Sequence, residues 1–245
     1  MLPSKHHYGP LVARPPAVHG TRLGLVIGSS LPANPFPALA RSTHDGVVVD
    51  DCGDFVVVLR HGAEGTVPAH LVDHHAHVRA LCAAGCDRVL ALGSGGGLRA
   101  DLGPGTVLAP DDFLALTTYP TFHDTTDGYA MAGFDPTWRA KVVAAWPSPI
   151  VDGGTYAMVR GPRFETRAEI RVLATQADVV GMTIPAECIL AGEAGLAYAA
   201  VCKVDNLANG VAGHDLTVDE YRDNVVADAA SFTADVARAL ASLAG

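Results

Sequence analysis

The sequence of 245 residues has no apolar run close to the roughly 20 residues that a membrane-spanning helix needs. Its first 20 residues also lack the apolar centre of a signal peptide. Basic residues are few, with 17 Lys and Arg against 26 Asp and Glu, and no basic run alternates with aromatic residues. A chain of net charge −9 would repel a polyanion. We therefore expect a cytoplasmic protein that binds neither membranes nor nucleic acids.

Cysteine is also scarce, and its pattern excludes two further classes of protein. The five cysteines are odd in number and scattered, so they do not form a disulfide framework. Cys82 and Cys86 lie four residues apart, but no second pair completes a metal site. We predict that the cysteines are small core residues. They are Cys52, Cys82, Cys86, Cys188 and Cys202.

Charged residues make up only 18% of the chain against 49% hydrophobic residues, a composition typical of a protein that folds around a core. The length fits one sizeable domain. Residues 1–21 are rich in proline and histidine without periodicity, so we expect a loosely ordered N-terminal arm there. Residues 22–245 then form the folded domain.

Short apolar runs recur along the chain, and each is followed by polar residues or glycine. Residues 23–27 precede Gly28, residues 55–59 stop at Arg60, and residues 88–92 stop at a run of glycines. Such runs are typical of buried strands that deliver a loop at their carboxyl ends. Further strands are expected at 106–109, 156–159, 179–182 and 196–204, with a helix over about 72–84. Strands that alternate with helices predict an α/β fold.

Two later helices begin at capping boxes, Thr166 with Glu169 and Thr217 with Glu220. The second box opens what we predict to be one long C-terminal helix, with a single apolar stripe packed on the sheet. The stripe consists of Val218, Tyr221, Val225, Ala229, Phe232, Val236 and Leu240.

The ends of the predicted strands carry the groups needed to hold a small oxyanion. Ser29, Arg60 and His61 supply a hydroxyl, a guanidinium and an imidazole, and Thr183 supplies a second hydroxyl. Ligand sites in open α/β sheets lie at the carboxyl ends of strands. Taken alone, Arg60 and His61 would equally suit a surface ion pair.

The glycine run 93–97 suggests a nucleotide site, but its context excludes one. Residues 98–105 cannot open a helix, as a dinucleotide fingerprint requires. The run lacks the lysine of a phosphate loop, and Ser94 lacks the glycine two positions earlier that a nucleophile elbow needs. We interpret the run as a glycine-rich turn that offers backbone N–H groups and Ser94 to an oxyanion.

Four histidines, His70, His74, His75 and His77, raise the question of a zinc site, because His70 and His74 would share one helical face. Catalytic zinc needs three converging ligands, and only Asp73 is suitably spaced as a further partner. Histidine is tolerated near the start of a helix. We therefore favour a structural role for these histidines and expect no metal.

Phe164 and Glu165 lie immediately before the helix capped by Thr166, which places both in a loop. An aromatic ring and a carboxylate can together stack on a heterocycle and hydrogen-bond it. Alternatively, Glu165 serves only as a partner for the positive end of the helix dipole.

Taken together, these segments resemble the trimeric purine nucleoside phosphorylase and methylthioadenosine or methylthioinosine phosphorylase family from Leu23 onward. The most specific pieces are Gly161–Thr166, which reads Gly-Pro-Arg-Phe-Glu-Thr, and Gly181–Thr183 followed by Glu187. The other matching pieces are Ile27–Leu31, Arg60–Gly62, Gly95–Arg99, Pro104–Gly105 and Asp152–Tyr156.

The resemblance implies a single α/β domain with a mixed twisted β-sheet flanked by helices, and a homotrimer or a dimer of trimers. It implies phosphate as co-substrate and no metal or organic cofactor. The implied phosphate-binding residues are Ser29, Arg60, His61, Ser94 and Thr183. The implied nucleoside-binding residues are Phe164, Glu165, Met182 and Asn206, and the implied catalytic residues are His61 and Asn206.

Glu165 with Asn206 is similar to the pair found in family members that use 6-oxopurines, whereas members that use 6-aminopurines usually have Ser and Asp. A carboxylate accepts a hydrogen bond from N1–H of hypoxanthine or guanine but faces a lone pair at N1 of adenine. That mismatch costs about 1–3 kcal/mol. We therefore expect phosphorolysis of inosine, guanosine or a 5′-modified inosine to free base and ribose 1-phosphate.

Two alternatives stay open at this point. One is a methylthioadenosine phosphorylase. The other is a catalytically silent nucleoside-binding protein, which the unusual Gly93 and Ser94 suggest because family members usually have Thr or Asn followed by Ala there. The 5′ substituent of the nucleoside is also open, since a family histidine directed at that end is replaced near Ala130 and Met131.

Overall fold

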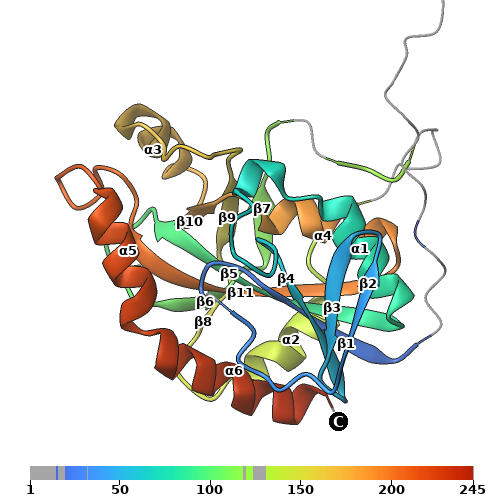
Figure 1. The fold of residues 1–245 in the computed structure, drawn as a ribbon. Helices are drawn as coiled ribbons and strands as arrows, with labels where there is room; N and C mark the ends of the chain where they lie inside the picture. Colours follow the sequence, from blue (N-terminus) through green and yellow to red (C-terminus); the bar gives the residue numbers. More distant parts are fainter. Residues whose placement is uncertain (1–14, 16–19, 32, 118–119, 124–130, 245) are drawn as a thin grey trace, which may run out of the picture.

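The computed structural model describes residues 15, 20–31, 33–117, 120–123 and 131–244 and confirms a single α/β domain (Figure 1). Most of the expected N-terminal arm lies outside these residues, so the arm stays a prediction. Ala130, near which the family histidine is replaced, is likewise outside the described residues.

One mixed sheet of eleven strands forms the centre of the described chain. Its order is β2-β3-β4-β1-β5-β10-β9-β7, and β11 pairs with β5 and β6 while β6 pairs with β8. Strands β4, β1, β5 and β11 run parallel side by side. The strands are β1 (Arg22–Ile27), β2 (Ala40–His44), β3 (Val47–Asp51), β4 (Phe55–Leu59), β5 (Cys86–Gly97), β6 (Val107–Ala109), β7 (Asp112–Leu114), β8 (Val151–Asp152), β9 (Thr155–Met158), β10 (Val179–Gly181) and β11 (Ala197–Leu207).

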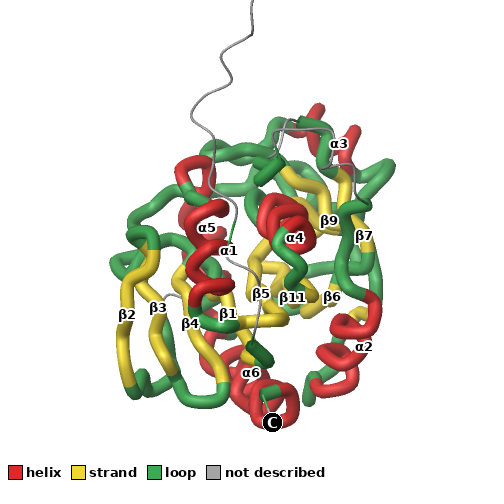
Figure 2. Tube along the Cα trace, turned by 90° about the vertical axis from the view of Figure 1, so that its right-hand side faces the viewer, coloured by secondary structure: helices red, strands yellow, loops and turns green. Residues whose placement is uncertain are grey.

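Helices cover both faces of this sheet, and the alternation of side chains along the strands explains why. In β1, Leu23, Leu25 and Ile27 point into one buried cluster, which also holds the apolar residues of α2 (Pro136–Ala145) and α6 (Ala229–Leu243). Val26 points into the other cluster, together with residues of α1 (His74–Ala83) and α4 (Ile184–Glu193). Figure 2 shows the same layers from the side.

The predicted helix over about 72–84 is confirmed as α1, and the box at Thr166 is confirmed at the start of α3 (Arg167–Leu173). There the Thr166 hydroxyl accepts from the Glu169 N–H at 3.3 Å, and Glu169 accepts from the Thr166 N–H at 2.7 Å. At Thr217 the threonine half of the box is present, with the Glu220 N–H donating at 3.1 Å. A short 3₁₀ helix, η1 (Ala69–Leu71), precedes α1.

The prediction of one long C-terminal helix is wrong. The chain forms α5 (Val218–Ala227) and α6, which are separated at Asp228 by non-helical backbone angles, φ −109° and ψ 12°. The apolar side chains of α6 pack on the sheet, but no residue of α5 is buried, and Tyr221 faces a cavity. The apolar stripe continues through both helices in the sequence, but only its second half, on α6, packs on the sheet.

The predicted turn at the glycine run 93–97 is also wrong, because β5 continues to Gly97. This segment pairs with β11 on one side and with β10 on the other. A side chain at Gly97 would overlap the carbonyl of Leu102, and one at Gly95 would lie 2.8 Å from the carbonyl oxygen of Val180. The glycines therefore allow close backbone packing rather than a turn.

The cysteines are core residues as predicted, except that Cys52 is only partly buried. Every helix in the described part of the chain is too short or too polar to span a bilayer.

Candidate active site

A cavity of about 590 Å³ opens where the carboxyl ends of β1 and β4 meet the ends of β5, β10 and β11. This volume suits a small-molecule site. All the residues predicted from the sequence to bind phosphate or nucleoside line it, although they come from segments far apart in the chain. They are Ser29, Arg60, His61, Ser94, Phe164, Glu165, Met182, Thr183 and Asn206.

Arg60 is the cation of this cavity, and it is 2% exposed. Its guanidinium donates to both carboxylate oxygens of Glu187, at 2.5 and 2.9 Å, and to the Leu92 carbonyl at 2.8 Å. One N–H group of each terminal nitrogen then remains for a ligand. A side chain at Gly28 would collide with this guanidinium, so the loop after β1 needs glycine there. The buried ion pair excludes the alternative of a surface salt bridge.

Glu187 holds Arg60 in place from the first turn of α4. Its carboxylate also accepts a hydrogen bond from the Tyr198 hydroxyl at 2.9 Å, and His74 Nδ1 lies 3.5 Å away. Burial alone would raise the pKa of Glu187, but attraction to Arg60 outweighs it and holds the pKa far below its usual range. Glu187 is therefore ionised, and the charge of Arg60 is balanced within the protein.

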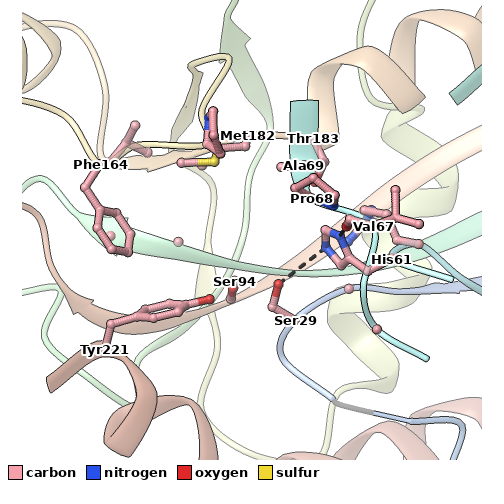
Figure 3. Close-up of a pocket in the computed structure, with 18 of the residues that line it drawn as sticks. Ser29, His61, Val67, Pro68, Ala69, Ser94, Phe164, Met182, Thr183 and Tyr221 are labelled. Carbon is pink, nitrogen blue, oxygen red and sulfur yellow. Dashed lines mark hydrogen bonds between the residues drawn. The ribbon is translucent and has the colours of Figure 1, made fainter. Parts of the chain in front are cut away.

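His61 is held as a neutral imidazole. Burial, followed by repulsion from Arg60, lowers its pKa. Its Nδ1 lies 2.8 Å from the Val67 carbonyl oxygen, which requires Nδ1 to carry the hydrogen. Nε2 is then an acceptor, and it lies 3.4 Å from the Ser29 hydroxyl (Figure 3).

Thr183 differs from the other two threonines that begin helices. Thr166 and Thr217 bond back to their own helices, whereas the Thr183 hydroxyl makes no capping hydrogen bond at the start of α4. Thr183 is 7% exposed, and it lines the cavity. Its hydroxyl and the backbone N–H groups at the amino end of α4 can therefore donate hydrogen bonds to an anion in the cavity.

Phe164 and Glu165 form the opposite end of the cavity. Glu165 is buried, and burial raises the pKa of its carboxyl group. Its loop is fixed by Arg163, which binds Glu169 through two hydrogen bonds of 2.8 and 2.7 Å, so Arg163 and Glu169 have a structural role. Glu165 is thus a cavity residue rather than only a partner for the helix dipole.

Asn206 lies on β11 and lines the same cavity as Glu165, and its Nδ2 donates to the Leu207 carbonyl at 2.8 Å. Asn209, which the sequence analysis missed, joins two walls of the cavity. Its Nδ2 donates to the Glu165 carbonyl at 2.9 Å, and its Oδ1 accepts from the Leu216 N–H at 3.2 Å.

The sequence analysis also missed Glu187 as the partner of Arg60, and Tyr221 as a cavity residue. Glu187 was noted only as part of a motif, and a partner 127 residues away leaves no local signal. Tyr221 fitted the apolar stripe of a helix, which gave no reason to place its hydroxyl in a site.

The four histidines considered for zinc do not converge. His74 faces Glu187, His75 Nε2 lies 3.0 Å from the Thr121 carbonyl oxygen, and burial lowers the pKa of His77 to about 4. Within residues that the structure describes, no group of three His, Cys, Asp or Glu side chains could hold a metal ion.

Residues 30–242 match the family described as "Phosphorylase superfamily". The chain is 34% identical over 176 residues to "Probable 6-oxopurine nucleoside phosphorylase" of Archaeoglobus fulgidus, covering 70% of this chain and 71% of the relative. It is 34% identical over 191 residues to "Probable S-methyl-5′-thioinosine phosphorylase" of Methanocaldococcus jannaschii, covering 73% and 74%.

The fold of this chain is also similar to that of a solved structure. The methylthioadenosine phosphorylase from Schistosoma mansoni in complex with adenine aligns with a TM-score of 0.77 and 25% identity, covering 90% of this chain and 91% of that chain.

Proposed function

This chain belongs to the phosphorylase superfamily, and from that premise we propose that it splits purine nucleosides with inorganic phosphate, giving free base and ribose 1-phosphate. The family membership confirms the resemblance drawn from the sequence. The observation that supports this activity best is a single cavity that is lined by oxyanion-binding groups together with the Glu165 carboxylate and the Asn206 amide.

The residues divide into two sets along the cavity. We assign phosphate to Arg60 with the hydroxyl groups of Ser29, Ser94 and Thr183, and with His61 beside them. We assign the purine to Phe164, Glu165 and Asn206, which leaves the sugar between the two sets, against Met182. In Figure 3, Phe164 lies on one side of the cavity and His61 lies on the other.

The proposed reaction needs no covalent enzyme intermediate. The C1′–N9 bond of the nucleoside stretches, the sugar gains positive charge, and the bound phosphate dianion stabilises that charge before it bonds to C1′. Asn206 donates to N7 and stabilises the negative charge on the departing purine, which takes up, through solvent, the proton that phosphate releases when it bonds to C1′. His61 is neutral, and its Nε2 is an acceptor. It positions phosphate by accepting a hydrogen bond either from the hydroxyl group of the phosphate or from Ser29.

The buried carboxylate of Glu165 favours 6-oxopurines. An ionised Glu165 accepts from N1–H of hypoxanthine or guanine, whereas N1 of adenine offers only a lone pair. We also propose that the protein is a cytoplasmic homotrimer or dimer of trimers, and that phosphate is its only co-substrate, without metal or organic cofactor.

The decisive assay incubates the protein with inosine, guanosine, methylthioinosine or methylthioadenosine, with and without phosphate, and measures the free base released. Phosphate-dependent release of hypoxanthine or guanine is expected. Preferential release of adenine would instead identify a methylthioadenosine phosphorylase. Binding of a nucleoside without release of any base would identify a silent nucleoside-binding protein and contradict the proposal.

Replacing Asn206 with aspartate is expected to shift preference from 6-oxopurines toward 6-aminopurines, because a carboxyl group that donates to N7 has a second oxygen that can accept from a 6-amino group but repels a 6-oxo group. The measurement is the ratio of kcat/KM for inosine and adenosine. Asn206→Ala is the matched control, since it removes the donor and should lower both rates. An unchanged ratio in Asn206→Asp would count against the role of Asn206.

A further inference from the structure

Tyr221 spans the two ends of the cavity from a position on α5. Its ring meets Phe164 edge to face, with centroids 5.3 Å apart and an interplanar angle of 66°. Its hydroxyl points away from Phe164 toward Ser94 and Ser29 (Figure 3). Burial, followed by repulsion from Asp205, raises the pKa of this hydroxyl, and side-chain hydrogen bonding with the two serines opposes that shift. The phenol thus ends among residues assigned to phosphate.

The position of α5 is fixed by a buried cation rather than by apolar packing. Lys203, 1% exposed on β11, donates through Nζ to the Val225 carbonyl at 3.0 Å. The same Nζ lies 3.1 Å from Asp205 Oδ1, in an ion pair that is also buried. A buried ammonium group that lost its hydrogen bond to the Val225 carbonyl would be left without that partner and away from water, so this contact favours a defined place for α5. Tyr221 is thereby held over the cavity.

The oxyanion end of the cavity needs donors of this kind. Glu187 balances the charge of Arg60, and His61 presents an acceptor, since its hydrogen is on Nδ1. A phosphate dianion therefore depends on neutral O–H and N–H donors at short range. A phenol is a stronger donor than a serine hydroxyl because it is more acidic.

We propose that Tyr221 donates its hydroxyl to bound phosphate, together with Ser29 and Ser94, while its ring forms the wall of the sugar site facing Met182. This inference rests on the proposed phosphorylase function and adds a binding residue to it. It makes α5 part of the phosphate site.

The test is Tyr221→Phe, which keeps the ring and its contact with Phe164 but removes the hydroxyl. We expect KM for phosphate to rise about 10-fold or more, the effect of losing a hydrogen bond to a charged group. KM for inosine should stay within about 2-fold, since the wall is retained. Val226→Ala, an exposed apolar position on the same helix, is the control and should leave both constants unchanged.

A second substrate separates phosphate from the other polar group within reach, the 5′-hydroxyl of the nucleoside. With 5′-deoxyinosine, the rise in KM for phosphate caused by Tyr221→Phe should be the same as with inosine. A rise in KM for inosine that disappears with 5′-deoxyinosine would overturn the proposal. The increase in Tm caused by added phosphate provides a direct binding measurement, and it should shrink in Tyr221→Phe.

The proposed function and the role of Tyr221 are refuted by different results. A wild-type protein that releases no base from any purine nucleoside would refute the proposed function. A wild-type protein that is active, with Tyr221→Phe unchanged in KM for phosphate and in the Tm increase, would refute only the role of Tyr221.

Discussion

Replacing Arg60 with methionine is expected to raise KM for phosphate at least about 100-fold, with a much smaller change in KM for inosine. The guanidinium is the cation of the proposed phosphate site, and each hydrogen bond from it to an anion contributes about 1.5–3 kcal/mol. Steady-state kinetics with phosphate and inosine varied separately measure both constants.

The same substitution is expected to destabilise the fold, since it leaves the Glu187 carboxylate buried without its cation. Loss of one partner of a buried ion pair costs about 3–5 kcal/mol in free energy of unfolding. Glu187 would keep only the Tyr198 hydroxyl and His74 as neighbours among the groups described above. Chemical denaturation measures this loss.

A double variant separates the two effects of Arg60. In Arg60→Met with Glu187→Gln, no unpaired charge is buried, so much of the stability should return while KM for phosphate stays high. Glu187→Gln alone keeps the cation but loses its charged support, and we expect a smaller rise in KM for phosphate. Recovery of phosphate affinity in the double variant would show that Arg60 only stabilises the fold. A larger effect on inosine than on phosphate would contradict the assignment of Arg60.

Replacing Glu165 with glutamine is the second change with a large expected effect. The ionised carboxylate accepts from N1–H of a 6-oxopurine, and a neutral amide forms a weaker bond, so kcat/KM for inosine should fall about 10-fold to 100-fold. The glutamine N–H can donate to N1 of adenine, which should raise kcat/KM for adenosine. The ratio of the two values is the measurement, and an unchanged ratio would remove Glu165 from the base site.

The pH profile gives an independent check on Glu165. Burial raises its pKa above the ordinary value of 4.5, and the protonated form cannot accept from N1–H. As the pH falls through this raised pKa, kcat/KM for inosine should decline. Glutamine does not titrate, so the acid limb that comes from this group should be absent from Glu165→Gln. An identical acid limb in both proteins would assign it to another residue.

The sequence predicted the strand ends well because the signal there is local. An apolar run that stops at Ser29, or at Arg60 and His61, has one simple interpretation in an α/β sheet, and these residues do meet at one cavity. The capping partner of Thr166 likewise lies only three residues away, at Glu169, so a short sequence pattern could predict it.

The features that the sequence predicted wrongly or missed have a different cause. Each of them depends on distant parts of the chain. The glycines 93–97 read as a turn, but their conformation follows from the approach of β10 and of the Leu102 carbonyl. The apolar stripe continues through the break at Asp228, so the stripe carries no signal for it. Glu187 has no sequence feature that points to Arg60, since only the packing of α4 against the sheet brings them together.

The balanced pair of Arg60 and Glu187 has a consequence for how an anion reaches its site. A dianion approaching a chain of net charge −9 meets an unfavourable field at long distance, and the Arg60 guanidinium in the cavity is already neutralised by the Glu187 carboxylate. Long-range electrostatic attraction therefore does not guide the anion into the cavity. Recognition begins only at contact, where the shape of the donor set decides which anion stays.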